Sequence, residues 1–280
     1  MLNKKIIAKN FSDAANNYNS QAQTQTIAAK KLVELVNPFI AKNSKILDIG
    51  SGTSFIEKNL TKNFSSNIEI HEIDLAPQML NHWQERPKNV IAICDDFENF
   101  QFKNNSFDIV ASSFSLQWIE NIDNCFKKIY EILTKNGVLI FCLPIFGSLE
   151  ELIKSSIDSD CNFNFLSFFK ETEIKNSLLK NQFSLNFSQV LEIEESCENA
   201  ILALKKIKKT GASYSNHSQK AINKNKLINF NDFYLRNFLK EGKKLIVSLK
   251  SRQAEYEIEL PMTAKQITEL LKQVSKDDTI

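Results

Sequence analysis

Long apolar runs, glycine and paired cysteines are all scarce in this chain. No stretch is long and apolar enough to span a membrane, and the first residues, MLNKKIIAKNF, lack the apolar segment of a signal peptide. We therefore expect a cytoplasmic protein. The five cysteines are an odd number without the short paired spacing of a zinc site, so we expect reduced, structural thiols and no metal. Because there are six glycines in all, a cluster of them is informative.

The length and composition are those of an ordinary globular protein. The 280 residues fit one large domain, or one domain with an inserted cap, and 42% of them are hydrophobic. The net charge of +2 by itself indicates neither a nucleic-acid partner nor a membrane partner. The charge is unevenly distributed: residues 205–250 contain twelve Lys and Arg but two Asp and Glu, which gives about +10, against about −8 elsewhere.

Hydrophobic spacing divides the first half of the chain into alternating helices and strands. Residues 10–36 have apolar positions three and four apart, which predicts an amphipathic helical region, interrupted near residues 16–20 and closed by Pro38. The predicted strands that follow are 45–50, 67–75, 89–97, 106–119 and 135–146, and the predicted helices are 54–64, 76–86 and 121–133. This alternation predicts a mostly parallel sheet with right-handed crossovers and helices on both faces.

After Gly147 the alternation loosens. Helices are predicted at 147–160, 171–183, 197–212 and 230–242, strands at 184–195 and 243–260, and a frayed helix and tail over the last twenty residues. The predicted fold class is therefore α/β, a doubly wound, mostly parallel, seven-stranded sheet with an N-terminal helical segment and an inserted helical lid. The predicted parts are the N-terminal helical segment (1–42), a core (43–150), the lid with a late strand (151–240), and C-terminal strands and tail (241–280).

The stretch KILDIGSGTSF places Asp48, Gly50 and Gly52 at the end of the first predicted strand. In a doubly wound sheet, ligands bind beyond the carboxyl ends of the strands, where the strand order reverses. Glycine has no Cβ, so a ligand can approach the backbone there, and the N–H groups of the following helix would face a carboxylate or phosphate. The same residues also fit a plain tight turn between a strand and a helix.

Two more acidic residues end the next predicted strands. Asp74, in EIDL, could accept hydrogen bonds from both hydroxyls of a ribose, or could cap the helix that begins near Pro77. Asp96, in CDDF, could accept from an exocyclic amine while the backbone N–H of Phe97 donates to a ring nitrogen, as adenine requires. Capping is again the alternative. Three acidic strand ends in register, each suited to a different part of one nucleoside, favour a nucleoside ligand.

These residues resemble the motifs of the class I S-adenosylmethionine-dependent methyltransferases over residues 44–144. The resemblance implies a Rossmann-like fold and S-adenosylmethionine as cofactor, covered by the N-terminal segment. The acid-Gly-x-Gly turn would hold the methionine end, the second acid the ribose, and the third acid with its neighbouring backbone the adenine. Ser54 stands where this family has a third glycine, which also argues against a dinucleotide. The implied cofactor-binding residues are Asp48, Gly50, Ser51, Gly52, Asp74, Leu75, Asp96, Phe97 and Ser113.

Segments outside this core are similar to the malonyl-acyl-carrier-protein O-methyltransferase family of biotin synthesis. The similar segments are FSDAANNYNSQAQTQTIA (11–28), NSFDIVASSFSLQWIEN (105–121), GSLEEL (147–152) and ALKKIKKTGA (203–212, the lid helix). The similarity covers about three quarters of the chain and fades beyond Gly211. It implies transfer of a methyl group from S-adenosylmethionine to the free carboxylate of a malonyl thioester, carried by acyl carrier protein or coenzyme A.

The resemblance also implies roles for residues near the acceptor. A carboxylate of pKa about 4 is already ionised at neutral pH, so no general base is expected. Tyr18 is expected to close over the cofactor and orient the carboxylate through its hydroxyl, and a packed core tyrosine is the alternative. Gln117 and Trp118 could line the acyl pocket or pack the following helix, and Lys205 and Lys209 are expected to meet the substrate.

The basic segment 205–250 suggests a partner of opposite charge. Carrier proteins are strongly acidic, so a positive surface beside the pocket would steer one in. For any single lysine, a solvated surface is the alternative. We expect no nucleic-acid or membrane partner, because the aromatic residues of 230–238 follow one helix face rather than interleaving with the lysines.

Other functions remain open at this stage. A methyltransferase for another carboxylic acid or a quinone would share every cofactor residue but would need neither the basic lid nor the N-terminal signature. An arginine-hydroxylating protein of complex I assembly resembles this family, but its N-terminus differs around Tyr18. A non-catalytic protein that binds S-adenosylmethionine would be consistent with Ser54 in place of glycine.

Overall fold

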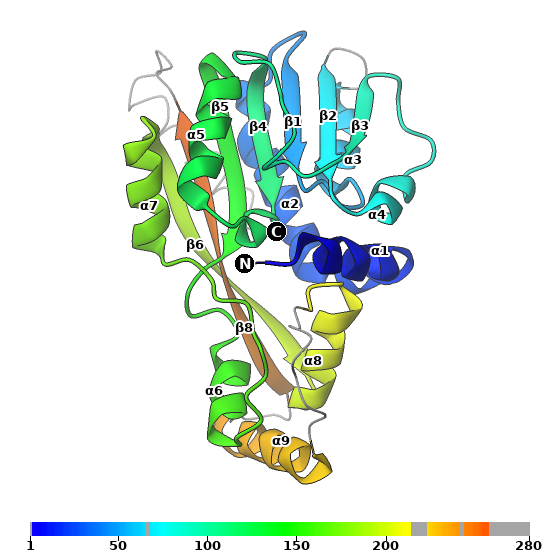
Figure 1. Ribbon diagram of the computed structural model, residues 1–280, viewed down its shortest axis with the longest axis vertical. Coiled ribbons are helices and arrows are strands. Elements are labelled where there is room, and N and C mark those ends of the chain that lie inside the picture. Colours follow the sequence, from blue (N-terminus) through cyan, green and yellow to red (C-terminus); the bar gives the residue numbers. More distant parts are fainter. Residues whose placement is uncertain (1, 65–67, 214–222, 241–243, 258–280) are drawn as a thin grey trace, which may run out of the picture.

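The computed structural model describes residues 2–64, 68–213, 223–240 and 244–257. Its strands form a single sheet (Figure 1). The strands are β1 (Lys45–Ile49), β2 (Glu69–Asp74), β3 (Val90–Cys94), β4 (Phe107–Ser113), β5 (Leu133–Pro144), β6 (Ser184–Cys197), β7 (Leu239–Lys240) and β8 (Lys244–Glu257). Their order is β3-β2-β1-β4-β5-β8-β6, with β7 beside β8. Strands β1 to β5 pair in parallel, and β8 is antiparallel to β5, β6 and β7.

Helices cover both faces of this sheet and its lower end. They are α1 (Lys4–Gln21), α2 (Gln23–Val36), the 3-10 turn η1 (Asn37–Phe39), α3 (Phe55–Phe64), α4 (Pro77–Asn81), the 3-10 turn η2 (Leu116–Trp118), α5 (Ile122–Ile132), α6 (Glu150–Asp158), α7 (Glu171–Lys180), α8 (Ala200–Lys209) and α9 (Lys224–Phe238). None of the helices in the described part of the chain has the length and hydropathy that crossing a bilayer requires.

The central strands are apolar on both faces because helices cover both. Successive residues of a strand point to opposite sides. In β5, Ile140 and Cys142 pack with α2 and α3, whereas Phe141 and Leu143 pack with α5 and α7. Each fully buried side chain of this kind contributes about 1.5–3 kcal/mol. The two clusters fix the sheet as a rigid support for the loops at its carboxyl end.

The predicted α/β, mostly parallel architecture is confirmed, but the predicted count of seven strands is wrong. The short strand β7 adds an eighth, at the point where the chain turns from α9 into β8. The helix predicted at 76–86 ends at Asn81, and the Arg86 guanidinium donates to the carbonyl oxygens of Leu80, within the helix, and Trp83, just beyond it. The helix predicted at 230–242 begins earlier, at Lys224, and ends at Phe238.

The N-terminal region is two helices that meet at Ala22 rather than near residues 16–20. Helix α1 begins at Lys4, six residues before the predicted start, because the Asn3 side chain accepts the Ile6 N–H at 3.2 Å. Tyr18 lies within the unbroken helix and stacks on Phe55. The tail predicted for the last twenty residues lies outside the described residues, as does most of the polar linker after Gly211.

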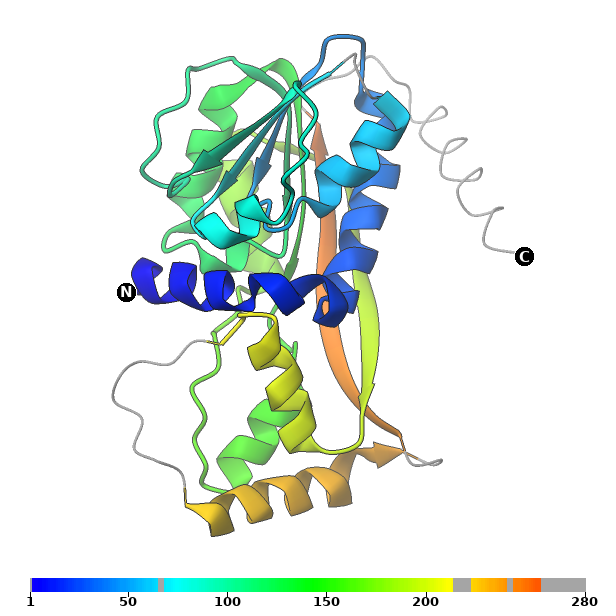
Figure 2. The same cartoon turned by 90° about the vertical axis from the view of Figure 1, so that its right-hand side faces the viewer.

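The strand order reverses at β1, which pairs with β2 on one side and β4 on the other. A ligand site is expected at such a point. Helix α1 crosses beneath the carboxyl ends of these strands, between the sheet and α8 (Figure 2). Strands β6 and β8 extend beyond the ends of the parallel strands toward α6, α8 and α9. These three helices share a separate apolar cluster that includes Leu152, Ala203, Phe230 and Tyr234. We call these three helices the lid.

Candidate active site

The turn after β1 uses its two glycines for different reasons. Both have positive φ, +69° at Gly50 and +55° at Gly52, where a side chain is strained. A Cβ added at Gly50 would lie 2.0 Å from the Ser115 Oγ, so Gly50 is needed for packing against the loop after β4. A Cβ added at Gly52 would meet no atom within 4 Å. Gly52 therefore leaves its space open to a ligand.

Ser54, in place of the family's third glycine, keeps the glycine-like conformation. Its φ is +66°, its side chain is fully buried, and its N–H donates to the Ser51 carbonyl at 2.9 Å. A left-handed conformation costs a residue with a Cβ about 1–2 kcal/mol. The substitution therefore adds strain to the turn without changing its path.

Asp74, at the end of β2, is held by the turn that it faces. One carboxylate oxygen accepts the Gly52 N–H and the other accepts the Ala76 N–H, both at 2.8 Å. It is thus not the N-cap of α4, which is Ala76. Burial raises the pKa of Asp74 to about 6, and the two backbone hydrogen bonds oppose that rise. Each oxygen keeps a lone pair for a ribose hydroxyl.

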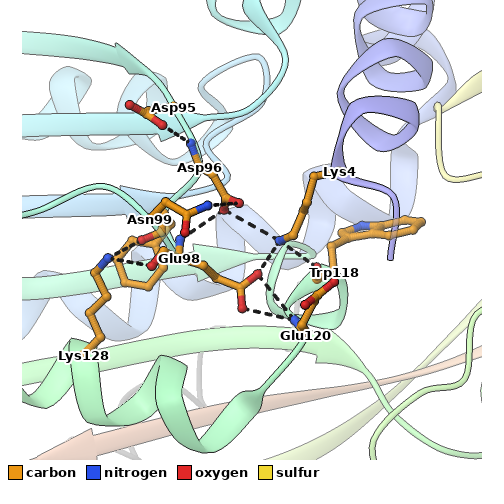
Figure 3. Close-up of polar contacts among 9 residues, drawn as sticks. Lys4, Asp95, Asp96, Glu98, Asn99, Trp118, Glu120 and Lys128 are labelled. Carbon is orange, nitrogen blue, oxygen red and sulfur yellow. Dashed lines mark hydrogen bonds and ion pairs between the residues drawn. The ribbon is translucent and has the colours of Figure 1, made fainter. Parts of the chain in front are cut away.

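The loop after β3 places Asp96 beside Lys4, the first residue of α1 (Figure 3). The Asp96 carboxylate accepts the Glu98 N–H and the Asn99 side-chain amide, each at 3.1 Å. The Phe97 N–H makes no hydrogen bond with any described residue and so can donate to a ligand. Lys4 Nζ lies 3.7 Å from the Asp96 carboxylate. Sequence reasoning missed Lys4, because nothing local marks one lysine in the stretch NKKIIAK.

Three carboxyls are buried together beneath the glycine turn: Asp48, Glu57 and Glu72. Asp48 and Glu72 are register partners on β1 and β2, and Glu72 is paired with Arg86 Nε at 2.7 Å. Burial raises the pKa of Asp48 to about 7 and holds the pKa of Glu57 well above its usual range. Two buried carboxyls that interact this closely are not both ionised, so Asp48 and Glu57 hold a proton near neutral pH.

Two cavities meet beneath the sheet. The donor cavity, about 80 Å³, lies at the carboxyl ends of β1, β2 and β4, and the acceptor cavity, about 420 Å³, lies between α1 and the lid. Phe11, Tyr18, Phe114 and Trp118 line both. Seven of the nine predicted cofactor residues line the donor cavity: Gly50, Gly52, Asp74, Leu75, Asp96, Phe97 and Ser113. The other two, Asp48 and Ser51, are buried and line neither cavity.

Tyr18 is held by aromatic neighbours where the two cavities meet. Its ring stacks on Phe55 at 5.9 Å and meets Phe11 edge-on at 6.5 Å. Phe11 in turn meets Trp118 edge-on at 5.6 Å. Burial, and then the negative charge of Asp74, raise the pKa of the Tyr18 hydroxyl. The hydroxyl therefore stays protonated and can donate a hydrogen bond but cannot act as a base.

The predicted acceptor residues divide into those that face the acceptor cavity and those that do not. Gln117 and Trp118 line it, and Gln117 is oriented by its side-chain amide, which donates to the Phe114 carbonyl at 2.8 Å. Lys205 and Lys209 are exposed and line neither cavity. Lys205 and Lys209 stay predicted substrate residues, while 3.6 residues per turn bring other positions of α8 to the cavity.

The lysines that do line the acceptor cavity are Lys206 and Lys208. Lys206 pairs with Glu195 at 2.6 Å, and Glu195 also accepts the Thr24 hydroxyl. Part of the positive charge counted in residues 205–250 is thus neutralised by other elements; Lys226, similarly, pairs with Asp160 at 2.6 Å.

The residues of the donor cavity fit S-adenosylmethionine. The space left open by Gly52, the free Phe97 N–H and the remaining lone pairs of Asp74 match the needs of an amino acid, a purine and a ribose. Asp74 and Asp96 thus line the cavity from adjacent strand ends. Among the described residues, no group of three or more His, Cys, Asp or Glu is placed to hold a metal ion.

Known proteins support the same conclusion. The methyltransferase-domain family matches residues 47–141. The malonyl-[acyl-carrier protein] O-methyltransferase 1 of Ilyobacter polytropus is 30% identical over 223 residues, which are 76% of this chain and 80% of that protein. A malonyl-[acyl-carrier protein] O-methyltransferase of Halorhodospira halophila is 26% identical over 146 residues, covering 50% of this chain and 48% of the relative.

Solved structures agree on the fold. The crystal structure of a Bacillus halodurans protein assigned as a methyltransferase superposes with a TM-score of 0.59 at 14% identity, covering 82% of this chain and 99% of that one. The predicted cofactor, S-adenosylmethionine, is therefore confirmed by the family and by the chemistry of the donor cavity. This chain belongs to the class I S-adenosylmethionine-dependent methyltransferases, close to the malonyl-[acyl-carrier protein] O-methyltransferases.

Proposed function

We propose that this protein is an O-methyltransferase that methylates the free carboxylate of a malonyl thioester, malonyl-acyl carrier protein, in the pimeloyl stage of biotin synthesis. The observation that carries the proposal is the meeting of two cavities at Tyr18, with donor-binding groups on one side and an aromatic chamber on the other. The acceptor's identity rests on relatives that bear this name.

The donor supplies an activated methyl group, and the protein has to align a carboxylate with it. A carboxylate of pKa about 4 is ionised at neutral pH, so no side chain has to remove a proton. The Tyr18 hydroxyl, which burial keeps protonated, would donate to one carboxylate oxygen and leave the other to attack. The aromatic lining keeps water out, which favours a reaction between opposite charges that ends in neutral products.

The lid would receive the carrier protein. On α8, Lys205 and Lys209 are exposed, and so they remain available to an acidic partner rather than to the malonyl group. Lys206 and Lys208, at the cavity wall, are the better candidates for meeting the pantetheine arm or the thioester.

A second acceptor class is favoured by the size of the acceptor cavity. About 420 Å³ lined by Phe11, Phe163, Phe165, Phe168 and Leu204 is more apolar space than a malonyl group requires. Either the pantetheine arm fills it, or the acceptor is a larger carboxylic acid or a quinone.

A panel of acceptors tests the proposal. The purified protein with S-adenosylmethionine is offered malonyl-acyl carrier protein, malonyl-coenzyme A, longer dicarboxylic acids and a quinol, and methylated product and S-adenosylhomocysteine are measured by mass spectrometry. We expect the highest kcat/KM with malonyl-acyl carrier protein, and rescue of a biotin-requiring strain that lacks this step. Preference for another acceptor would refute the substrate, and no S-adenosylhomocysteine with any acceptor would indicate a non-catalytic binding protein.

A further inference from the structure

Lys4 joins three segments around the adenine end of the donor cavity. It is the first residue of α1, and its Nζ lies 2.5 Å from a Glu98 carboxylate oxygen, after β3. The same Nζ donates to the Trp118 carbonyl, after β4, at 3.1 Å. The side chain is largely buried, with 20% of it exposed. Figure 3 shows it between Asp96, Glu98 and Trp118.

Asp96 lies beside Lys4, but its carboxylate oxygens make no hydrogen bond with the Lys4 ammonium. The 3.7 Å between Lys4 Nζ and Asp96 Oδ1 exceeds hydrogen-bond length, so Lys4 offsets the charge of Asp96 but leaves a lone pair available. Glu98 makes the direct contact instead, and its carboxylate also accepts the Glu120 N–H at 3.2 Å.

The second lysine in the region, Lys128, contacts backbone carbonyl oxygens rather than carboxylates. Lys128 Nζ donates to the carbonyl oxygens of Phe97, Glu98 and Phe100 and holds the loop from its other side. Among the described residues, Lys4 is the cation that contacts both side-chain carboxylates, Asp96 and Glu98. Without it, two adjacent carboxylates would repel each other in a partly buried site and turn apart.

We propose that Lys4 is a positioning residue for donor recognition: it holds the Asp96 carboxylate and the Trp118 loop in the arrangement that accepts the exocyclic amine of adenine. The proposal rests on donor binding in this cavity and not on the identity of the acceptor.

Lys4 also sets the position of α1, which carries Phe11 and Tyr18. An α-helix of 18 residues is about 27 Å long and stiff, so fixing both ends fixes every side chain between them. One end is held by Lys4, and the other by the Thr53 hydroxyl, which donates to the Asn19 side chain at 2.5 Å. Binding of adenine and placement of Tyr18 are thereby joined through one helix.

Calorimetry with two nucleosides tests the proposal without any methyl transfer. S-adenosylhomocysteine has the exocyclic amine, and its 6-deamino analogue, with unsubstituted purine in place of adenine, has a hydrogen there and keeps the ring nitrogen N1 as an acceptor. We expect the wild type to prefer the adenine compound by about tenfold or more, since a hydrogen bond to a charged acceptor is lost in the other. In Lys4→Met, we expect about tenfold weaker binding of S-adenosylhomocysteine and a much smaller preference.

Two further variants separate positioning from general damage. Lys9→Met removes an exposed lysine from the same helix, where it pairs with Asp13, and should bind both compounds as the wild type does. Lys4→Arg keeps the charge and should retain most of the preference. Circular dichroism and thermal unfolding establish that each variant folds, and if Lys4→Met does not, Glu98→Gln takes its place with a smaller expected loss. Unchanged preference in the folded variant, or equal loss for both compounds, would overturn the proposal.

Discussion

The donor cavity and the acceptor cavity are built from different materials. The donor cavity adds to its apolar wall a set of directed polar groups at the carboxyl ends of β1 to β4, such as the Gly52 N–H on Asp74. The acceptor cavity is formed by aromatic and aliphatic side chains from α1, the loop after β4, the segment 163–168 and α8. One holds a ligand by hydrogen bonds in fixed directions, and the other by shape and exclusion of water.

This difference explains where specificity can vary. Directional hydrogen bonds need particular residue types at particular backbone positions, so the donor half leaves motifs in the sequence. Apolar walls tolerate exchanges that preserve volume, so the acceptor half leaves few. Tyr18 belongs to both, and variants on either side of it can show whether the division holds.

The largest effect is expected on the free energy of unfolding, at Glu57, which is buried beneath the donor cavity. Burial, and next the charge of Asp48, hold the folded pKa of Glu57 well above its value in an unfolded chain, so Glu57 destabilises the fold at and above neutral pH and this penalty fades as the pH falls toward 4.5. Glu57→Gln should therefore raise the free energy of unfolding at pH 8 and change it little at pH 4.5.

Urea unfolding across this pH range measures that change. Glu69→Gln is the matched control, because Glu69 is a half-exposed residue of β2, and no gain at pH 8 is expected from it. A gain at Glu57 that does not depend on pH would contradict a shared proton.

The next largest effect is expected at Tyr18, where the donor and acceptor cavities meet. Tyr18→Phe should leave S-adenosylhomocysteine affinity unchanged and lower kcat about 10- to 100-fold, because a hydrogen bond to a charged group contributes about 1.5–3 kcal/mol. Steady-state kinetics and calorimetry give the two numbers. Tyr130→Phe, at a partly buried tyrosine of α5 whose hydroxyl donates to the Gln182 side chain at 3.4 Å, is the same substitution away from both cavities. Wild-type turnover in Tyr18→Phe would show that the Tyr18 hydroxyl has no part in catalysis and that the side chain serves packing alone.

The two glycines of the turn should separate binding from stability. Gly52→Ala places a methyl group in the space left open for the ligand, and we expect S-adenosylhomocysteine to bind about 5- to 30-fold more weakly, because overpacking a filled site by one methyl group costs about 1–2 kcal/mol. Gly50→Ala drives a methyl group into Ser115 instead, so its main effect should be a lower melting temperature. The distinction would be lost if both variants changed only stability.

The smallest effect belongs to the lid surface. Raising the salt concentration from about 50 to about 250 mM should increase KM for malonyl-acyl carrier protein several-fold and leave KM for malonyl-coenzyme A less affected, because exposed charges are screened beyond about 10 Å. Lys205→Glu should act in the same direction as salt. Lys127→Glu, at an exposed position on α5, reverses a charge away from the lid and should not. A KM that ignores both salt and Lys205 would exclude docking on α8.

The fold and half of the site could be predicted from the sequence because their signals are local. The period of the apolar residues predicted the parallel strands, and acidic residues at their ends predicted Asp74 and Asp96 at one rim. Lys4 and Glu57 could not be predicted, since the role of each depends on contacts with other segments of the chain or on burial under another element. That Lys206 and Lys208, and not Lys205, line the acceptor cavity could not be predicted for the same reason, because a helix has an inner face only once another element covers it.

By itself, the amino-acid sequence determined the alternation of strands and helices, the glycine turn and the chemistry of the donor-binding ends, because backbone geometry and residue type act over a few positions. The tertiary structure alone decided which carboxyls share a proton, which lysine meets Asp96 and which aromatic side chains enclose the acceptor. Those properties depend on burial and on distances of a few ångströms between segments that are far apart in the chain, and no local pattern records them.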